Sequence, residues 1–328
     1  MHHPRVGGLS CLSIGILLLS LSVAGVASAE PLKIRYAVWV GCGPLFLAQQ
    51  KGYFEAEKVE VQLIKMEDPK ETFLAMGAGR LDGIVATIDT VIPHLKTGKE
   101  FQYVLALDDS AGGDGIVARR EIKSIRDLRG KRVAVQEGSV SQFFLNVVLR
   151  EAGLSEKDVQ VVNMKPGDAG AAFVAGRVDA AVTWEPWLSS GKAAPHGHML
   201  VDSSQTPGLI TDVLVFQRDV IEKRPREIQS VVDAWNKAVA YWERNPAESN
   251  EIMARAVGDW LKDPRLFADV LTGLRFYNQP ANVRFFGTPQ NPGALYKVIQ
   301  NAIDITGASG QLRGKFVAGD LVNHSFVK

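Results

Sequence analysis

The segment AMGAGRLDGIV at residues 75–85 recurs as AFVAGRVDAAV at residues 172–182. Six positions are identical, and both copies read as the end of an apolar helix, a glycine that stops it, an Arg-x-Asp turn and a short buried strand. The copies begin at positions 75 and 172, which is too far apart for a solenoid unit of roughly 20–50 residues. The repeat therefore predicts two α/β lobes of similar construction that face each other across a cleft.

Residues 1–29 have the features of a secretory signal peptide. Arg5 precedes an apolar run from Leu9 to Val26, and Ala27-Ser28-Ala29 is a small-x-small cleavage signature. We expect cleavage after Ala29 and export to the periplasm. An uncleaved membrane anchor is the alternative, because the apolar run is almost long enough to span a bilayer.

The charge of the remaining chain is balanced. The whole chain has 37 Lys and Arg and 36 Asp and Glu, and removing residues 1–29 removes only Arg5, which leaves 36 of each sign. This balance argues against nucleic acid as a partner, because a nucleic-acid surface normally needs an excess of basic residues.

Cys42 is the cysteine that remains after cleavage, so no disulfide can form within the mature chain. We expect its thiol to be buried and to pack as an apolar group. No later segment is apolar enough to span a bilayer, so we expect a soluble monomer.

Strand and helix patterns alternate along most of the chain, which is typical of an α/β fold with two parallel-type sheets and flanking helices. Expected strands are residues 32–38, 59–64, 83–86, 101–107, 116–118, 131–136, 159–163, 180–183 and 212–216. Expected helices are residues 44–50, 71–78, 141–151 and 168–175, followed by a wholly helical C-terminal segment at 225–244, 246–257, 264–271 and 292–305. The glycine-rich residues 110–115 read as a crossover between lobes, and the strand at 212–216 as the return.

Ligands of open parallel sheets bind beyond the carboxyl ends of the strands, often against helix N-termini. This rule selects four loops, each between an expected strand and the next helix. The candidate ligand-binding residues are Trp39, Gly41 and Gly43 in the first loop, Thr87 and Asp89 in the second, Gly138, Ser139 and Ser141 in the third, and Trp184 and Glu185 in the fourth. Asp212, at the start of the returning strand, is a further candidate.

Each candidate has a structural alternative. Glycines let backbone N–H groups approach a ligand, but Trp39 is equally well explained as ordinary core. The hydroxyls and carboxylate of residues 87–90 equally well cap a helix, and so does the Gly-Ser turn at 138–141, which otherwise offers N–H groups and a hydroxyl to an anion. The Trp-Glu-Pro-Trp sequence at 184–187 offers a stacking face and a partner for a cation, with chance packing as the alternative.

Other kinds of site find little support. The Gly-x-Gly of residues 41–43 lacks the third glycine of a dinucleotide fingerprint, because position 46 is Phe. His196-Gly197-His198 has no nearby cysteine or carboxylate pair to complete a metal site. The sequence contains no H-E-x-x-H, G-x-S-x-G or P-loop motif and no evident nucleophile–base pair. We therefore expect neither cofactor nor metal and no catalytic residue.

These residues resemble a known family, the periplasmic substrate-binding proteins of ABC importers in the nitrate/sulfonate/taurine branch. The motifs that carry the resemblance are GPLFLA at 43–48, KGYF at 51–54, GRLD at 79–82, SIRDLRGKRVAV at 124–135, GS at 138–139, GRVD at 176–179, WEPW at 184–187, EKRP at 222–225 and AW at 234–235. The resemblance implies two lobes, residues 30–114 plus 213–328 and residues 115–212, joined by two hinge strands and closing over a small solute.

The implied function is that of the solute-binding component of an ABC importer, with its permease and ATPase as partners. Asp89, Glu137 and Glu185 make the candidate loops acidic, which favours a ligand with a cationic or amine end, such as an aminosulfonate, over a bare anion. One alternative is an enzyme on the same fold, since pyrimidine-forming enzymes resemble this family. A second alternative is a sensor that presents its liganded form to a membrane receptor.

Overall fold

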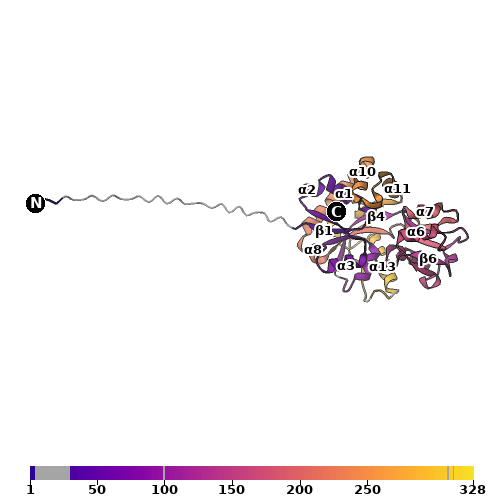
Figure 1. Cartoon of the computed structure of the whole chain (residues 1–328). Helices are drawn as coiled ribbons and strands as arrows, with labels where there is room; N and C mark the ends of the chain where they lie inside the picture. The colour runs from indigo at the N-terminus through magenta and orange to yellow at the C-terminus, as the bar shows by residue number, and fades with distance from the viewer. Residues whose placement is uncertain (4–29, 99, 309, 313) are drawn as a thin grey trace. The chain divides into compact units, whose positions relative to one another are not determined.

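The computed structural model describes residues 1–3, 30–98, 100–308, 310–312 and 314–328 (Figure 1). The chain divides into two units, Met1–Glu30 and Pro31–Lys328, and every helix and strand of the described residues belongs to the second. The predicted signal peptide and its cleavage site lie outside the described residues. Among the described residues, no helix has both the length and the apolar character needed to cross a membrane.

The first sheet has six strands in the order β11-β4-β10-β3-β1-β2. Their bounds are β1 Leu32–Tyr36, β2 Val61–Lys65, β3 Gly83–Thr87, β4 Phe101–Ser110, β10 Thr211–Gln217 and β11 Leu274–Phe276. β2, β1 and β3 pair in parallel, whereas β10 pairs antiparallel with β3 and β4, and β11 pairs antiparallel with β4. The expected parallel pairing therefore holds for one half of a mixed sheet.

Helices cover both faces of this sheet (Figure 1). They are α1 Gly43–Gln50, α2 Tyr53–Ala56, α8 Arg218–Lys223, α9 Pro225–Arg244, α10 Pro246–Val257 and α11 Pro264–Leu271, and α3 Pro69–Gly77, α4 Ile88–Val91, α12 Gln279–Phe286, α13 Ala294–Ala308 and α14 Ala318–Leu321. Successive residues of a strand point to opposite faces. Accordingly, Ile84 and Ala86 of β3 pack in the cluster with α3, α4 and α13, and Val85 packs in the cluster with α1, α9 and α10. Burial on both faces explains why Gly83–Thr87 is continuously apolar up to its last residue.

The second sheet has five strands in the order β7-β6-β8-β5-β9. Their bounds are β5 Asp114–Arg119, β6 Arg132–Val135, β7 Gln160–Asn163, β8 Ala180–Trp184 and β9 Gly197–Asp202, and the helices are α5 Val140–Glu151, α6 Pro166–Val174 and α7 Trp187–Ala193. β7, β6 and β8 run parallel, and β5 pairs antiparallel with β8 and β9. Val117 packs with α6 and α7, whereas its neighbours Ile116 and Ala118 pack with α5, so this sheet is also covered on both faces.

The chain passes from the first sheet to the second between Ser110 and Asp114 and returns between the 3-10 turn Ser203–Gln205 and Thr211. At the first crossing, the backbone N–H groups of Ala111 and Gly113 both donate to the carbonyl oxygen of Gly273, at 2.8 and 3.0 Å. A Cβ on Gly273 would lie 2.7 Å from the Gly113 nitrogen, so the two backbones approach too closely for a side chain there. The predicted lobe boundaries, after residues 114 and 212, fall one residue into β5 and two residues into β10, just beyond these crossings, and stay a prediction about which parts move together.

The repeated Gly-Arg-x-Asp segment makes the same hydrogen bonds in both sheets. Asp82 accepts a hydrogen bond from the backbone N–H of Lys33 at 2.8 Å, and its own N–H donates to the Lys33 carbonyl at 2.9 Å. Asp179 and Arg132 repeat both bonds at 2.9 and 3.0 Å. Gly79 and Gly176 precede these turns with φ of 67° and 71°, a conformation that glycine adopts without strain. The repeat thus joins the strand that follows it to the neighbouring parallel strand, β1 in the first sheet and β6 in the second.

Two sequence expectations about secondary structure were wrong. The C-terminal segment is not wholly helical, because β11 lies between α11 and α12. β11 has only three residues, too few to show an alternating pattern. β9 was missed as well, since residues 197–202 begin with the Gly197-His198 pair that suggested a metal site.

We expect Asp82→Ala and Asp179→Ala each to lower the free energy of unfolding by about 1–3 kcal/mol, because each leaves a strand N–H without its charged acceptor. Urea denaturation followed by circular dichroism measures the change. Asp82→Asn and Asp179→Asn are the matched controls, since an amide oxygen still accepts from the same N–H group. Alanine variants that unfold at the wild-type urea concentration would contradict a structural role for the repeat.

Candidate functional site

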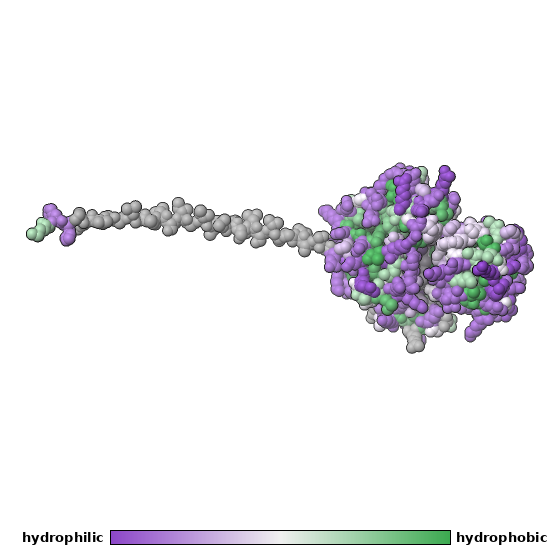
Figure 2. Space-filling model, viewed as in Figure 1, coloured by the Kyte–Doolittle hydropathy of each residue, from purple (hydrophilic) through white to green (hydrophobic). Residues whose placement is uncertain are grey.

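A cavity of about 420 Å³ is lined by residues of both sheets. The first sheet contributes the loop after β1, the end of β3, the end of β4 and the start of β10. The second contributes the start of β5, the loop after β6 and the end of β8. Figure 2 shows a furrow between the surface that carries α6 and α7 and the rest of the second unit. The cavity follows the rule that ligands of α/β sheets lie beyond the strand ends.

Two carboxylates oppose each other on the wall formed by the first sheet. Asp212 of β10 pairs in register with Asp108 of β4 on one side and with Thr87 of β3 on the other. Residues directly opposite on neighbouring strands project from the same face, so the two carboxyl groups lie on one wall of the cavity. Asp108 is only 1% exposed, and its Oδ1 accepts a 3.4 Å hydrogen bond from Trp39 Nε1, whereas its Oδ2 has no hydrogen-bond partner among the described residues.

A third carboxylate enters from the second sheet. Asp114 is the first residue of β5 and pairs in register with Trp184 at the end of β8. It is 5% exposed, and the Ser110 hydroxyl is its side-chain hydrogen-bond partner. Burial raises the pKa of Asp114 to about 6, against the opposing effect of that hydrogen bond. The crossover between the sheets therefore places a carboxyl group with a raised pKa in the cavity lining.

These carboxyl groups hold their protons unusually well. Burial, followed by repulsion from Asp114 and Asp89, raises the pKa of Asp212 to about 7. Burial and the charge of Asp212 place the pKa of Asp108 well above its usual value. Asp89, buried in the first turn of α4, has a pKa raised to about 7, mainly by burial. Near neutral pH, the carboxyl groups of Asp114 and Asp212 in this cavity thus bind and release protons readily.

Arg35 is the buried basic residue of this wall. Its Nε donates to the Met66 carbonyl at 2.7 Å and its Nη1 donates to the Val85 carbonyl at 2.8 Å. Burial lowers the pKa of the Arg35 guanidinium, while the nearby Glu67 and Asp212 act in the opposite direction. Arg35 is therefore held by the backbone of two neighbouring segments, and it pairs with no carboxylate at ion-pair distance among the described residues.

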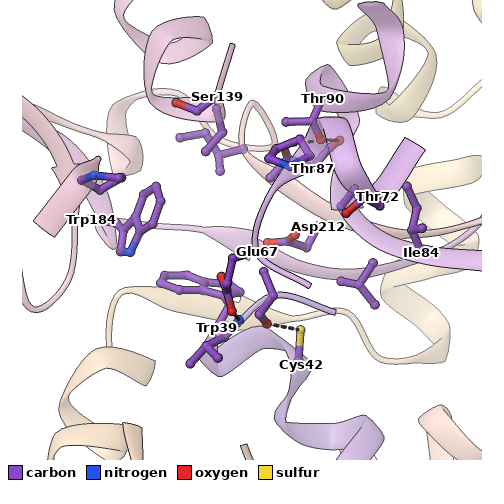
Figure 3. A pocket seen from close by; sticks show the side chains of 18 of the residues that line it. Trp39, Cys42, Glu67, Thr72, Ile84, Thr87, Thr90, Ser139, Trp184 and Asp212 are labelled. Carbon is purple, nitrogen blue, oxygen red and sulfur yellow. Dashed lines mark hydrogen bonds between the residues drawn. The ribbon is translucent and has the colours of Figure 1, made fainter. Parts of the chain in front are cut away.

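Aromatic and hydroxyl side chains complete the lining. Figure 3 shows the Trp39 and Trp184 rings on one side of the cavity and Thr87, Thr90 and Ser139 on the other. The hydroxyl groups of Thr87 and Thr90 lie 3.2 Å apart, and that of Thr90 donates to the Thr87 carbonyl. The Ser139 hydroxyl donates to the carbonyl of Gln136 at 2.7 Å. A solute in this cavity would contact indole faces, hydroxyl groups and carboxylates.

Five of the eleven predicted ligand-binding residues line the cavity. They are Trp39, Thr87, Ser139, Trp184 and Asp212. Each comes from a different loop or strand end, and the structure brings them together as the strand-end rule predicts. Their contact with a solute stays a prediction.

The other six predicted residues are not part of the lining, and their surroundings explain why. Gly41 and Gly43 allow close packing, since a Cβ would lie 1.8 Å from Asp108 Oδ2 at Gly41 and 2.7 Å from Met253 Sδ at Gly43. Glu185 accepts hydrogen bonds from the N–H and hydroxyl of Ser189 in α7. The remaining three are Asp89, which is buried within α4, Gly138, whose N–H donates to Gln142, and Ser141, which is buried in α5.

Cys42 and the two histidines of the rejected metal motif have ordinary partners. Cys42 reaches the cavity wall but is 1% exposed, and burial, with the charges of Asp212 and Asp108, holds the pKa of its thiol well above the usual value. A neutral thiol is a poor nucleophile. The Nε2 atoms of His196 and His198 lie 2.9 and 2.8 Å from the carbonyl oxygens of Phe173 and Ile122. No group of three or more His, Cys, Asp or Glu in the described part of the chain is arranged to hold a metal.

The residues that give the cavity its charge were not among those predicted from the sequence. Asp114 lies in the segment 110–115, which was predicted only to be a crossover, and Asp108 lies two residues before that segment. The available signal was the Asp108-Asp109 pair directly after the apolar run of residues 103–107, because carboxylates seldom continue a buried strand without a reason. Arg35 carried no such signal, since a basic residue in an alternating strand normally faces solvent.

Comparisons with known proteins agree with this architecture. A family model described as "NMT1/THI5 like" matches residues 39–249. A relative in Bacillus subtilis (strain 168), named as an aliphatic sulfonates-binding protein, is 26% identical over 330 residues that cover 98% of this chain and 96% of the relative. The solved periplasmic aliphatic sulphonate binding protein SsuA from Escherichia coli superposes on this chain with a TM-score of 0.72 at 21% identity. The match covers 90% of this chain and 92% of the SsuA chain. This likeness confirms the predicted two-sheet fold of periplasmic binding proteins.

Fold similarity also extends to an enzyme. The solved desulfurization enzyme DSZB superposes on this chain with a TM-score of 0.61 at 14% identity. The match covers 91% of this chain and 98% of the DSZB chain. The fold is therefore compatible with both binding and catalysis, and the residues of the site are the basis for distinguishing the two functions.

We expect Gly41→Ala to displace the Asp108 carboxylate, because the new Cβ would occupy the position of Oδ2. The expected result is a loss of about 1–3 kcal/mol in the free energy of unfolding. Gly77→Ala is the control, since no atom lies within 4 Å of its added Cβ at the end of α3. Equal urea midpoints for Gly41→Ala and wild type would contradict the packing of Asp108 against this glycine.

We expect the stability of the ligand-free protein to depend on these carboxyl groups. The pKa values of Asp89, Asp114 and Asp212 are about 6 to 7 in the folded protein and exceed the ordinary value of 3.8. Their contribution to the free energy of unfolding is therefore complete below pH 3.8 and is lost as pH rises through 6 and 7. Burial lowers the pKa of His94, so the contribution of His94 to the free energy of unfolding increases as pH rises. Urea midpoints of wild type and Asp212→Asn isolate the carboxylates: the variant should gain stability relative to wild type as pH rises from 5 to 8. A constant difference across that range would contradict the raised pKa.

Proposed function

Because the chain belongs to the NMT1/THI5-like family, we propose that it is the extracytoplasmic solute-binding component of an ABC importer. It binds a small solute between its two sheets and presents the closed form to a membrane permease and its ATPase. The names of the Bacillus subtilis relative and of SsuA support this assignment. The periplasm is the compartment in which such a component works.

The observation that carries the proposal is the cavity of about 420 Å³ with walls from both sheets. A solute that contacts both walls is bound more tightly when the two parts are closed than when they are open, and this difference drives closure. The predicted lobes, residues 30–114 plus 213–328 and residues 115–212, are the parts that move. Their crossings at residues 110–114 and 203–211 act as the hinges.

A row of tryptophans supports closure as the working motion. Trp184 lies at the end of β8, and its ring centroid is 6.3 Å from that of Trp187 in α7. The Trp187 ring lies 5.2 Å from that of Trp260, which belongs to the 3-10 turn Asp259–Leu261 between α10 and α11. The first two belong to the proposed second lobe and the third to the first. Their packing links the cavity wall to a contact between the lobes.

Binding without turnover is the better account of the cavity chemistry. The Cys42 thiol is held neutral by its surroundings, and its Sγ is directed to the Ala37 carbonyl at 3.6 Å. The cavity carboxyl groups are proton donors and acceptors, but none of them contacts a serine–histidine or cysteine–histidine pair among the described residues. The enzyme alternative therefore has no specific observation in its favour beyond the shared fold.

We expect one class of small solute to raise the melting temperature of the protein purified from the periplasm. The measurement is a thermal-shift screen of sulfonates, amines, nitrate and pyrimidines, followed by calorimetry on each hit and mass spectrometry of the solute after incubation. Trp184→Ala should weaken binding about tenfold, because stacking on an indole contributes on the order of 1 kcal/mol or more. Trp242→Ala is the control, since that indole bonds to Asn250 on α10 and lies outside the cavity lining.

Two outcomes oppose the proposal in different ways. If no solute stabilises the protein, the binding function fails. If a solute binds and its mass changes during incubation, the protein is an enzyme on this fold.

A further inference from the structure

The charge of the cavity differs from what an anionic solute needs. Asp108, Asp114 and Asp212 all line it, and none of them lies within ion-pair distance of a basic side chain in the described residues. Two basic residues line it as well, but Arg35 is engaged with the Met66 and Val85 carbonyls, and Lys165 is exposed at the N-terminus of α6. The buried part of the cavity therefore holds three carboxyl groups, and its guanidinium is already hydrogen-bonded to the backbone.

Asp108 and Asp212 form a pair that costs stability without a partner. Like charges directly opposite on antiparallel strands are destabilising, and these two residues are register partners. One oxygen of Asp108 has no hydrogen-bond partner among the described residues although the side chain is 1% exposed. An unpaired buried polar atom costs about 1–3 kcal/mol. A positively charged group beside both carboxylates would relieve both costs.

The rest of the lining suits an organic cation. Trp39 donates its indole N–H to Asp108, so its ring lies beside the carboxylate pair. Trp184 faces the same cavity from the second sheet (Figure 3). Indole faces attract cations through the ring quadrupole, and they also cover apolar carbon. Carboxylates for a charged end and indoles for an apolar body therefore occur in one cavity.

We propose that the solute is an organic cation, a protonated amine or a comparable nitrogen base, whose charged nitrogen is bound by Asp108 and Asp212. The proposal rests on the solute-binding function above and narrows it to one chemical class. It separates this chain from relatives named for sulfonates, because a sulfonate at this position would face two carboxylates at close range. Asp114 adds a third carboxyl group from the second sheet, so both walls of the cavity favour a cation.

The test compares probes of matched size and opposite charge on the protein purified from the periplasm. Butylamine and benzylamine are compared with butane-1-sulfonate and phenylmethanesulfonate, and with butan-1-ol and benzyl alcohol as neutral references. Thermal shift and isothermal titration calorimetry at neutral pH measure the binding. We expect the amines to bind at least about tenfold more tightly than the alcohols, and the sulfonates to bind more weakly than the alcohols.

Variants locate the charged end. Asp108→Asn and Asp212→Asn should each weaken amine binding about tenfold or more, because they keep the shape of the side chain and remove its charge. Asp109→Asn is the matched control, since Asp109 is buried on the same strand but bonds to Arg275 and the Gly208 N–H, away from the cavity. Circular dichroism and the melting temperature of each variant establish that it folds. Unchanged amine affinity in both folded cavity variants would overturn the proposal.

The outcomes separate this proposal from the function on which it rests. Sulfonates that bind more tightly than amines, or alcohols that bind as tightly as amines, overturn the cation proposal and leave the binding function standing. If none of these probes binds and the broader screen of sulfonates, nitrate and pyrimidines also finds no solute, the binding function itself fails.

Discussion

The hydrogen bond between a turn aspartate and a central parallel strand of each sheet is the constraint on which the rest depends. Asp82 holds the Lys33 N–H in one sheet, and Asp179 holds the Arg132 N–H in the other. Each bond lies one residue before the parallel pairs Ile34 with Gly83 and Val133 with Ala180, so it sets the register of the central strands. A one-residue slip would turn every side chain of a strand to the opposite face.

Register in turn decides which residues face the cavity. Once β3 is placed against β1, Thr87 is the residue at its end, and β10 brings Asp212 opposite it. The same placement in the second sheet leaves Trp184 at the end of β8, opposite Asp114. The repeated residues are alike because they perform the same structural task, whereas the strand ends beyond them, which differ in sequence, line the cavity.

Much of the fold could be predicted from the sequence, because helix stops, proline starts and buried strands leave local signals. Pro225–Arg244 and Pro246–Val257 have the predicted bounds for this reason. The antiparallel insertion of β10 between β3 and β4 leaves no such signal, since it depends on which strands meet in space. The carboxylate pair was hidden for the same reason: Asp108 and Asp212 are 104 positions apart, and only the register of β4 and β10 places them opposite each other. Gly41 was predicted to bind the ligand, but a Cβ at this position would meet the Asp108 carboxylate rather than open cavity.

The contact between the two glycine backbones at the first crossing has a mechanical consequence. Gly273 joins α11 to β11, and its carbonyl accepts from both Ala111 and Gly113 as the chain leaves the first sheet. The crossover is therefore anchored to the C-terminal helices. If the second sheet rotates about this point, as the proposed closure requires, the two hydrogen bonds to Gly273 would couple that rotation to the segment between α11 and β11.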